Sequence, residues 1–356
     1  MTLHHKPETP TRIAVAGAGL IGQAHLRVLA ANTQATISGI ADPSPASAQL
    51  AKQFGVPWYA SLGELLEQDQ ADGVVLATPN QLHVDQTLQC AQRGVPALLE
   101  KPVATSVAEG KRLLDAVTSA HAKVLVGHHR AHSPIMALTR EVVATGRLGK
   151  LVAVQGSATF YKPDHYFQEG PWRTKAGGGP ILINMIHEVH NLRMLCGEII
   201  AVQAFASSAS RGFEVEDTVA INLRFDSGVL GTFMLSDTAA SARSWEQTAQ
   251  ENKSYPSYDD EDCYTISGTA GTLAVPTMRL KYYADPSARS WWKPFQTEVL
   301  ALTREDPLER QMVHFIAVIR GHAEPLVSVR DGLQNLRVTE AIGQAVRAGK
   351  TISISS

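Results

Sequence analysis

The sequence is poor in cysteine and contains no long apolar run. Its three cysteines lie far apart and form no CxxC pair, so neither a disulfide framework nor a cysteine zinc site is expected. No stretch reaches the roughly 18 apolar residues of a membrane-spanning helix, and the first residues lack the apolar centre of a secretory signal. These absences predict a cytoplasmic protein with reduced thiols and no membrane partner.

An excess of either charge is also absent. The chain has 32 basic and 34 acidic residues, and because no block of like charge occurs, a nucleic acid is not an expected partner. Hydrophobic residues make up 44% and charged residues 19%, which is typical of ordinary globular proteins. The chain has 356 residues, which is more than a domain with a single hydrophobic core usually contains. Two domains are therefore predicted.

Apolar strands alternate with amphipathic helices over the first third of the chain. Residues 12–17 form a predicted buried strand, and residues 23–32 have the apolar spacing of a helix that packs on a sheet. The strands predicted next are 35–42, 71–79, 95–102 and 123–129, and the helices are 61–69, 80–94 and 106–121. This alternation predicts an α/β domain with a doubly wound parallel sheet.

A glycine-rich turn separates the first strand from the first helix. In "GAGLIG", Gly17, Gly19 and Gly22 have GxGxxG spacing around Leu20 and Ile21. This spacing allows a tight turn, a close approach of the backbone to a pyrophosphate and close packing of helix on strand. The free N–H groups at the start of the following helix also favour phosphate. The five residues are therefore candidates for dinucleotide binding.

An acidic residue ends the second strand at the expected distance from this turn. Asp42 stands 20 residues after Gly22, where a carboxylate would accept hydrogen bonds from the adenine ribose hydroxyls. The same charge would repel a 2′-phosphate, and no basic residue follows until Lys52. The pattern predicts NAD as the cofactor in preference to NADP.

Polar residues follow two later strands of the predicted sheet. Ligands of such sheets bind outside the carboxyl ends of the strands, so Thr78, Pro79, Asn80 and His83 of "ATPNQLH" are predicted to border the cofactor. The alternative for Asn80 is a helix N-cap, which is compatible with that role.

The segment "LLEKPVAT" places Glu100, Lys101 and Pro102 directly after a buried strand. Proline fixes the turn, and Lys101 is predicted to lie beside the nicotinamide half of the cofactor. Desolvation lowers the pKa of a lysine, which can then hold a substrate hydroxyl and help to move its proton. Glu100 is a candidate cofactor contact at the strand terminus. The alternative is that Lys101 is an exposed structural lysine.

The second half of the chain has a different pattern. After a predicted helix over 134–149, strand-like runs follow at 150–160, 199–209, 216–228, 229–239, 262–276 and 279–284. The turn sequences "DSG" and "TAG" favour antiparallel pairing. An α+β substrate domain is therefore expected after the cofactor domain. The polar insertion 244–264 is expected to be a surface or subunit-contact loop.

A predicted helix over 181–195 carries a polar stripe among apolar residues. Asn184, His187, Glu188 and Asn191 recur at helical spacing, as in a buried polar network or a functional site. Although the region is rich in histidine, His187 and Glu188 are adjacent and cannot both face one ion together with His190 without strain. No metal site is therefore predicted.

Together, "GAGLIG", Asp42, "ATPNQLH", "EKP" and "GGGPILINMIHEVHNLRMLCG" resemble the Gfo/Idh/MocA family, the glucose-fructose oxidoreductase and inositol dehydrogenase group, over nearly the whole chain. The resemblance implies an N-terminal Rossmann domain and a C-terminal α+β domain whose large, mostly antiparallel sheet often forms an oligomer interface. It also implies that Lys101 is catalytic or orients the substrate, that the peptide bond after it is often cis, and that His187 is the general base.

The chain departs from the family pattern near His187. The family commonly has an acid or Asn four residues before this histidine and an Asp three after it, where this chain has Ile183 and His190. Asn184 could replace the first only if the helix rotates locally. Further substrate-binding candidates by resemblance, each with plain surface charge or packing as its alternative, are His129, Arg130, Lys162, Arg173, Asn184 and His190.

These observations predict a Rossmann domain over 1–127 and a C-terminal domain over 128–356, with a last helix at about 331–348 that packs back on the first domain. The leading hypothesis is an NAD-dependent dehydrogenase that oxidises a carbinol of a sugar, cyclitol, sugar acid or carboxylated cyclic dihydrodiol. The alternatives are a redox-neutral NAD-dependent lyase or glycosidase, and a non-catalytic NAD-binding sensor. A homodimer or homotetramer through the C-terminal sheet is expected.

Overall fold

The computed structural model describes residues 9–68, 70–285, 287 and 289–355. They divide into two compact units. The first unit comprises the described residues up to His129 together with Leu308–Leu336, and the second comprises Arg130–Pro307 and the described residues from Arg337 onward. None of the helices formed by these residues is both long and apolar enough to span a membrane.

The first unit is built on a parallel sheet, which confirms the predicted fold. In the described part of the chain its six strands are β1 (Thr11–Ala16), β2 (Ala35–Ala41), β3 (Trp58–Tyr59), β4 (Gly73–Leu76), β5 (Ala97–Leu99) and β6 (Val124–Val126). They pair in the order β3-β2-β1-β4-β5-β6, with every pairing parallel. The strand order reverses between β1 and β4, and dinucleotides bind at this reversal in doubly wound sheets.

Helices connect these strands. They are α1 (Leu20–Ala31), α2 (Pro45–Phe54), α3 (Leu62–Glu67), α4 (His83–Gln92) after a 3₁₀ turn (Asn80–Leu82), and α5 (Val107–Ser119). Serine side chains accept backbone N–H groups at the starts of α2, α3 and α5, because the first N–H groups of a helix have no partner within the helix. Helix α2 was not predicted from the sequence.

A late segment returns to the first unit, which corrects the predicted contiguous division at residue 127. Helix α10 (Pro307–Ile319) and the first turns of α11 (Val329–Ala348) belong to this unit. A Cβ atom at Gly73 would lie 2.5 Å from Ile319, and one at Gly332 would lie 2.3 Å from Val103. Small residues therefore let the returning helices cover the apolar strands closely.

The second unit contains a large sheet, as predicted. Its strands among the described residues are β7 (Leu151–Thr159), β8 (Ile199–Ser207), β9 (Thr218–Phe225), β10 (Leu230–Ser236), β11 (Tyr264–Gly268), β12 (Gly271–Val275), β13 (Arg279–Tyr282), β14 (Gln296–Val299) and β15 (Ile352–Ser353). The order is β14-β13-β12-β11-β7-β10-β9-β8-β15. The β7–β10 pairing is parallel and the other pairings are antiparallel.

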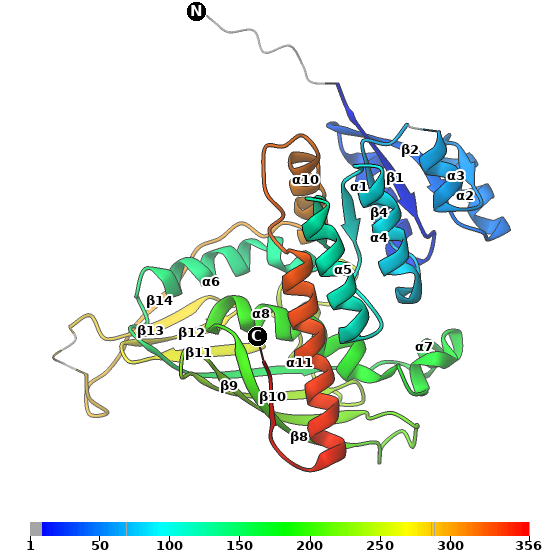
Figure 1. Cartoon of the computed structure of the whole chain (residues 1–356). Coiled ribbons are helices and arrows are strands. Elements are labelled where there is room, and N and C mark those ends of the chain that lie inside the picture. Colours follow the sequence, from blue (N-terminus) through cyan, green and yellow to red (C-terminus); the bar gives the residue numbers. More distant parts are fainter. Residues whose placement is uncertain (1–8, 69, 286, 288, 356) are drawn as a thin grey trace, which may run out of the picture. The chain divides into compact units, whose positions relative to one another are not determined.

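Helices cover one face of this sheet (Figure 1). Helix α6 (Pro134–Ala144) and helix α8 (Ile186–Cys196) contact each other and the strands β12 and β7. Shorter helical segments are the 3₁₀ turns His129–His132 and Pro171–Thr174, α7 (Asp164–Glu169) and α9 (Trp245–Thr248). Strands β9 and β10 bury alternate residues, so one face joins the apolar core and the other remains open.

Candidate functional site

The glycine turn of the first unit has the shape that a pyrophosphate needs. Gly17 has φ +92, and a Cβ atom there would lie 2.5 Å from the carbonyl oxygen of Ala77. A Cβ atom at Gly22 would lie 1.9 Å from the carbonyl oxygen of Gly17, whereas one at Gly19 would meet no atom within 4 Å. Gly17 and Gly22, the outer glycines, therefore let the turn pack closely against neighbouring backbone. Gly19 leaves the start of α1 open to a ligand.

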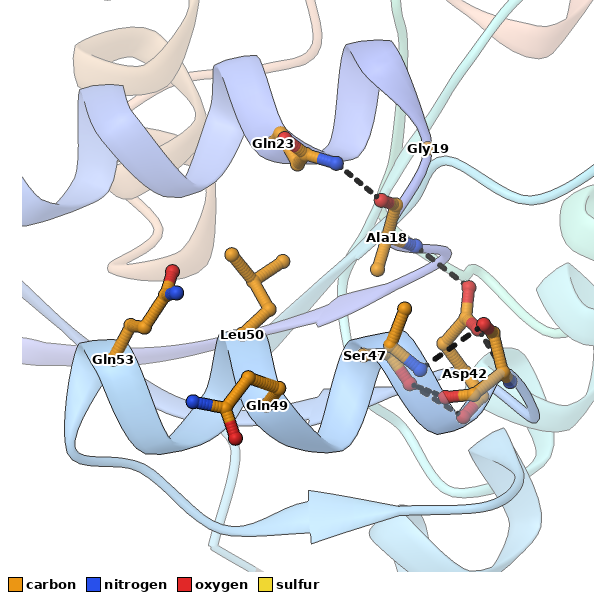
Figure 2. Close-up of a pocket in the computed structure, with 10 residues that line it drawn as sticks. Ala18, Gly19, Gln23, Asp42, Ser47, Gln49, Leu50 and Gln53 are labelled. Carbon is orange, nitrogen blue, oxygen red and sulfur yellow. Dashed lines mark hydrogen bonds between the residues drawn. The ribbon is translucent and has the colours of Figure 1, made fainter.

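Asp42 lies beside this turn (Figure 2). Its Oδ2 accepts the N–H of Ala18 at 2.8 Å, and its Oδ1 accepts the N–H of Ser44 at 2.8 Å. Each carboxylate oxygen has a second lone pair that can accept a hydroxyl. The two backbone bonds fix the carboxylate beside the glycine turn, where it can accept the hydroxyls of a ribose.

The pocket between these groups has a volume of about 380 Å³. Residues of the pocket that were not predicted lie in the glycine turn, on α1, on α2 or between β2 and α2, and they are Ala18, Gln23, Ser44, Ala46, Ser47, Gln49, Leu50 and Gln53. The helix after an acidic strand end is a recurrent part of a nucleotide site, so a prediction of α2 would have indicated most of them. The open helix start, the packed glycines and the fixed carboxylate fit the adenosine and pyrophosphate parts of a dinucleotide.

His83 joins the turns that follow β4 and β5. Its Nδ1 lies 2.7 Å from the carbonyl oxygen of Pro102, and its Nε2 lies 2.9 Å from that of Thr78. His83 is 1% exposed, so its ring binds the two turns themselves, and the prediction that it borders the cofactor stays a prediction. Pro79 stands before the 3₁₀ turn that begins at Asn80, so Asn80 is not its N-cap.

Glu100 is a buried acid at the end of β5. Its Oε1 lies 2.9 Å from Nε2 of His25, and its Oε2 accepts the backbone N–H of Lys101 at 3.3 Å. Burial alone would raise the pKa of Glu100, but the hydrogen bond from His25 and the charges of His25, Lys101 and His129 outweigh it and lower the pKa. The carboxylate is thus engaged inside the unit, and its contact with the cofactor stays a prediction.

Lys101 itself is partly exposed. The Lys101–Pro102 peptide bond is cis, as the family resemblance implied. The residue stands two positions after β5, at the carboxyl end of the parallel sheet.

Lys162 is the centre of a polar cluster in the second unit. Its Nζ donates to Oδ1 of Asn184 at 2.7 Å and lies 3.6 Å from Oδ2 of Asp237. The rings of Phe160 and Tyr166 lie 5.5 and 5.0 Å from this ammonium group. Burial lowers the pKa of Lys162 to about 8, although Asp237 opposes the shift. The cluster joins two of the predicted substrate contacts.

Two arginines complete this cluster. Arg173, a predicted substrate contact, stacks on the ring of Tyr166 at 3.9 Å. Arg211 was not predicted, and it donates to Oδ1 of Asp237 at 3.1 Å and to the carbonyl oxygen of Lys162 at 2.7 Å. No sequence pattern distinguishes Arg211 or Asp237, because their partners lie far away in the sequence.

The predicted helix over 181–195 is present but changes its winding. It is π-helical over Ile181–Met185 and α-helical over Ile186–Cys196. Asn184 lies in the π-helical turn, and such turns are frequent at functional sites. His187 is partly exposed, whereas His190 is 4% exposed. Because a substrate must reach a side chain to be oriented by it, His187 is the better placed of the two.

Arg130 occupies a buried ion-pair network in the second unit. Its Nη1 donates to Oε1 of Glu188 at 2.6 Å, and its Nη2 donates to Glu246. Tyr264 donates to the other oxygen of Glu188. Arg130 is 3% exposed, and a buried guanidinium requires such partners. The ion pairs account for the buried guanidinium, and a contact of Arg130 with the substrate stays a prediction.

The two ends of the polar insertion 244–264 contribute to the same network, whereas its residues 252–260 are exposed, as predicted for a surface loop. Trp245 is 3% exposed and Glu251 is 6% exposed. The indole N–H of Trp245 and the hydroxyl of Ser133 both donate to Glu251. Part of the insertion is therefore core structure, because its apolar and acidic side chains complete the surroundings of Arg130.

Replacing Glu251 by glutamine is expected to remove a pH dependence of stability. Burial raises the pKa of Glu251 from 4.5 to about 7, against the hydrogen bonds from Ser133 and Trp245. Between these values the folded state retains a proton that the unfolded state has lost, so stability falls as pH rises, by about 3 kcal/mol. Urea unfolding across this pH range should show a shallower fall for Glu251→Gln. The variant Glu261→Gln, at a partly exposed position of the same insertion, is the control. Equal slopes for wild type and Glu251→Gln would contradict the expectation.

The described residues contain no group of three or more His, Cys, Asp or Glu side chains arranged to hold a metal ion.

Comparisons with known proteins agree with these features. A family model described as "Oxidoreductase family, NAD-binding Rossmann fold" matches residues 11–128, and the GFO/IDH/MocA C-terminal domain matches residues 136–274. The chain is an oxidoreductase with an NAD-binding Rossmann domain. It belongs to the Gfo/Idh/MocA family.

Related proteins cover almost the whole chain. The rhizopine catabolism protein MocA of Rhizobium meliloti is 27% identical over 94% of both chains. The scyllo-inositol 2-dehydrogenase (NAD(+)) of Bacillus subtilis is 26% identical over 98% of this chain and 97% of its own. A solved structure of the WlbA dehydrogenase from Bordetella pertussis, in complex with NADH and UDP-GlcNAcA, is 26% identical with a TM-score of 0.76, over 98% of this chain and 99% of its own.

Proposed function

We propose that this chain is an NAD-dependent dehydrogenase that oxidises a carbinol of a polyhydroxylated small molecule. The observation that carries the proposal is the arrangement of the first unit. A fixed Asp42 carboxylate faces an open glycine turn, and a partly exposed Lys101 stands at the carboxyl end of the same sheet. Ligands of doubly wound sheets bind at that end. NAD, when bound, supplies the acceptor for the hydride that leaves the carbinol carbon.

Two side chains are assigned roles in the removal of the proton from the hydroxyl that is oxidised. Lys101 binds the substrate oxygen and stabilises the negative charge that develops there, and His187 is the general base that takes the proton. A carbinol that loses a hydride from carbon and a proton from oxygen becomes a carbonyl, so the two transfers balance. Histidine suits the base because its ordinary pKa lies near neutral pH.

The substrate-binding role is assigned to Lys162, Arg173 and Asn184 in the second unit, with His129 and His190 as further candidates. The bond from Lys162 to Asn184 supports a shared role for these two side chains, and the π-helical turn at Asn184 supplies the local change in winding that its use requires. Ammonium, guanidinium and amide groups suit hydroxyls and carboxylates. The substrate class is a sugar, cyclitol, sugar acid or carboxylated cyclic dihydrodiol, and relatives named for scyllo-inositol and crystallised with UDP-GlcNAcA support it.

The absorbance of NADH tests the proposal directly. Purified protein is mixed with NAD and, one by one, sugars, cyclitols, sugar acids and aromatic dihydrodiols, and the series is repeated with NADP. A substrate-dependent rise with NAD is the expected result. Product formation without net NADH would instead indicate a redox-neutral lyase or glycosidase. Tight NAD binding with no product from any compound would indicate a sensor.

We also propose that the chain forms a homodimer or homotetramer through the open face of the second sheet. Phe205 and Met234 are 71% and 44% exposed, and both pair with Ala220 across adjacent strands. Leu230, on the same face of β10, is 59% exposed. Adjacent exposed apolar side chains of this kind mark interaction surfaces.

Placing a charge on this face is expected to weaken the assembly. Phe205→Glu should shift the molar mass from light scattering toward that of one chain, because a desolvated carboxylate in an interface has no partner. Lys111→Glu, on the exposed side of α5 in the first unit, is the control. An unchanged oligomer in Phe205→Glu would exclude this face as the interface.

A further inference from the structure

We propose that His83 is a positioning residue that sets the direction of the Lys101 side chain by holding the carbonyl group of Pro102. The inference rests on the catalytic role proposed for Lys101. His83 itself does not reach the substrate, because its ring is buried against two backbone carbonyl groups.

The ring of His83 connects the ends of two neighbouring strands. Thr78 follows β4 and Pro102 follows β5, and these strands pair in parallel. Nδ1 lies 2.7 Å from the carbonyl oxygen of Pro102, and Nε2 lies 2.9 Å from that of Thr78. The hydroxyl of Thr87 donates to the backbone carbonyl oxygen of His83 at 2.7 Å. The ring of His83 thus extends from a fixed helix start and lies between the two turns at the carboxyl end of the sheet.

A second contact holds the backbone on the N-terminal side of Lys101. Its own N–H donates to Oε2 of Glu100 at 3.3 Å, and the other oxygen of Glu100 lies 2.9 Å from Nε2 of His25. A Cβ atom at Gly127 would lie 2.8 Å from the carboxyl carbon of Glu100, so the residue that follows β6 also confines this carboxylate. The backbone of Lys101 is held before and after the residue, and only its side chain extends from the fixed turn.

The two carbonyl contacts of His83 are not equivalent in function. A carbonyl oxygen only accepts hydrogen bonds, and a neutral imidazole carries one N–H. Burial lowers the pKa of His83 despite the carbonyl groups and Glu100, which oppose the shift, and the charge of Lys101 adds to it. The neutral ring therefore donates to one carbonyl at a time. Pro102 directly follows Lys101 in the chain, so the hydrogen bond to the carbonyl oxygen of Pro102 is the one that positions Lys101. This bond requires the N–H of the ring to be at Nδ1.

Replacing His83 by asparagine or by glutamine tests the two contacts one at a time. Asparagine places an N–H donor near the position of Nδ1, whereas glutamine places it near Nε2. His83→Asn is expected to keep kcat within about threefold of wild type, and His83→Gln is expected to lose about 30- to 100-fold, because a displacement of about 1 Å at a catalytic group can cost that much. KM and the dissociation constant for NAD should stay close to wild type in both variants. Equal kcat values for the two variants would overturn the proposal.

A readout that does not need turnover separates this proposal from the proposed function. Reductive methylation with ¹³C-formaldehyde labels the lysines, and Lys101→Arg identifies the signal of Lys101. The proposal expects the pH titration of that signal to shift in His83→Gln and to match wild type in His83→Asn. If no substrate is found for the wild type, the proposed function fails while this titration still tests the positioning. If the wild type turns over and the titration is the same in all proteins, the positioning fails alone. Thermal unfolding and NAD binding confirm that each variant is folded.

Discussion

Replacing Lys101 by methionine is expected to lower kcat for the substrate about 1000-fold, because a positioned acid–base group contributes about 10²- to 10⁴-fold. Methionine keeps the unbranched stem and removes the ammonium group. Lys101 lies outside the residues that line the nucleotide pocket, so the dissociation constant for NAD should change less than about threefold. Stopped-flow measurement of NADH in a single turnover, with a saturating substrate, gives the rate of the chemical step without product release.

The matched control is Lys111→Met, which removes an exposed ammonium group from α5 of the same unit. It should behave as wild type. A single-turnover rate in Lys101→Met within about tenfold of wild type would show that Lys101 is an ordinary surface lysine, since a general acid–base role is larger than that. A matching loss of NAD affinity would show instead that the side chain holds the cofactor.

The nucleotide pocket was predictable because its parts are close together in the sequence. Gly17, Gly19, Gly22 and Asp42 lie in one strand–helix–strand unit, and each has a local physical requirement. The structure places them as the spacing indicated, with packed outer glycines, an open Gly19 and a fixed carboxylate. The parallel sheet followed from the alternation of apolar runs and helices over the same region.

The ion pairs of the second unit were not predictable in this way. Arg130 bonds to residues 58 and 116 positions away in the chain, Glu188 and Glu246. Nothing in the local sequence distinguishes a buried arginine from an exposed one, because the difference is made by side chains that the tertiary fold brings together. The same holds for Arg211, whose partner Asp237 lies 26 positions further on.

The return of α10 to the first unit was not predicted, for a related reason. The sequence predicted that the last helix packs back on the first domain, and the first turns of α11 belong to that unit. Helix α10 has an ordinary amphipathic pattern that does not indicate which sheet it covers. The packing of Ile319 against Gly73 and of Val103 against Gly332 decides it. The parallel pairing of β7 with β10 was also missed, because two strands with a long connection can pair in either direction.

Replacing Asp42 by asparagine is expected to raise the ratio of kcat/KM with NADP to kcat/KM with NAD about 100-fold. A carboxylate about 4 Å from a unit negative charge costs about 4 kcal/mol at an effective dielectric constant near 20, and partial exposure of Asp42 reduces this. Asparagine removes the charge and keeps one oxygen acceptor for a backbone N–H. It also weakens the bonds to the ribose hydroxyls, since hydrogen bonds to a charged acceptor are the stronger ones. The change in ratio should therefore come from both a gain with NADP and a loss with NAD.

Asp85→Asn is the matched control, because Asp85 is an exposed acid on α4 of the same unit, paired with Arg112 at 2.9 Å. Its cofactor ratio should stay at the wild-type value. Raising the salt concentration should reduce the difference between Asp42→Asn and wild type, since screening weakens exposed charge interactions. If the ratio in Asp42→Asn stayed within about threefold of wild type, the carboxylate would not face the 2′ position. The preference for NAD would then have to arise from the shape of the pocket beside α2, where Ser44 and Ser47 stand.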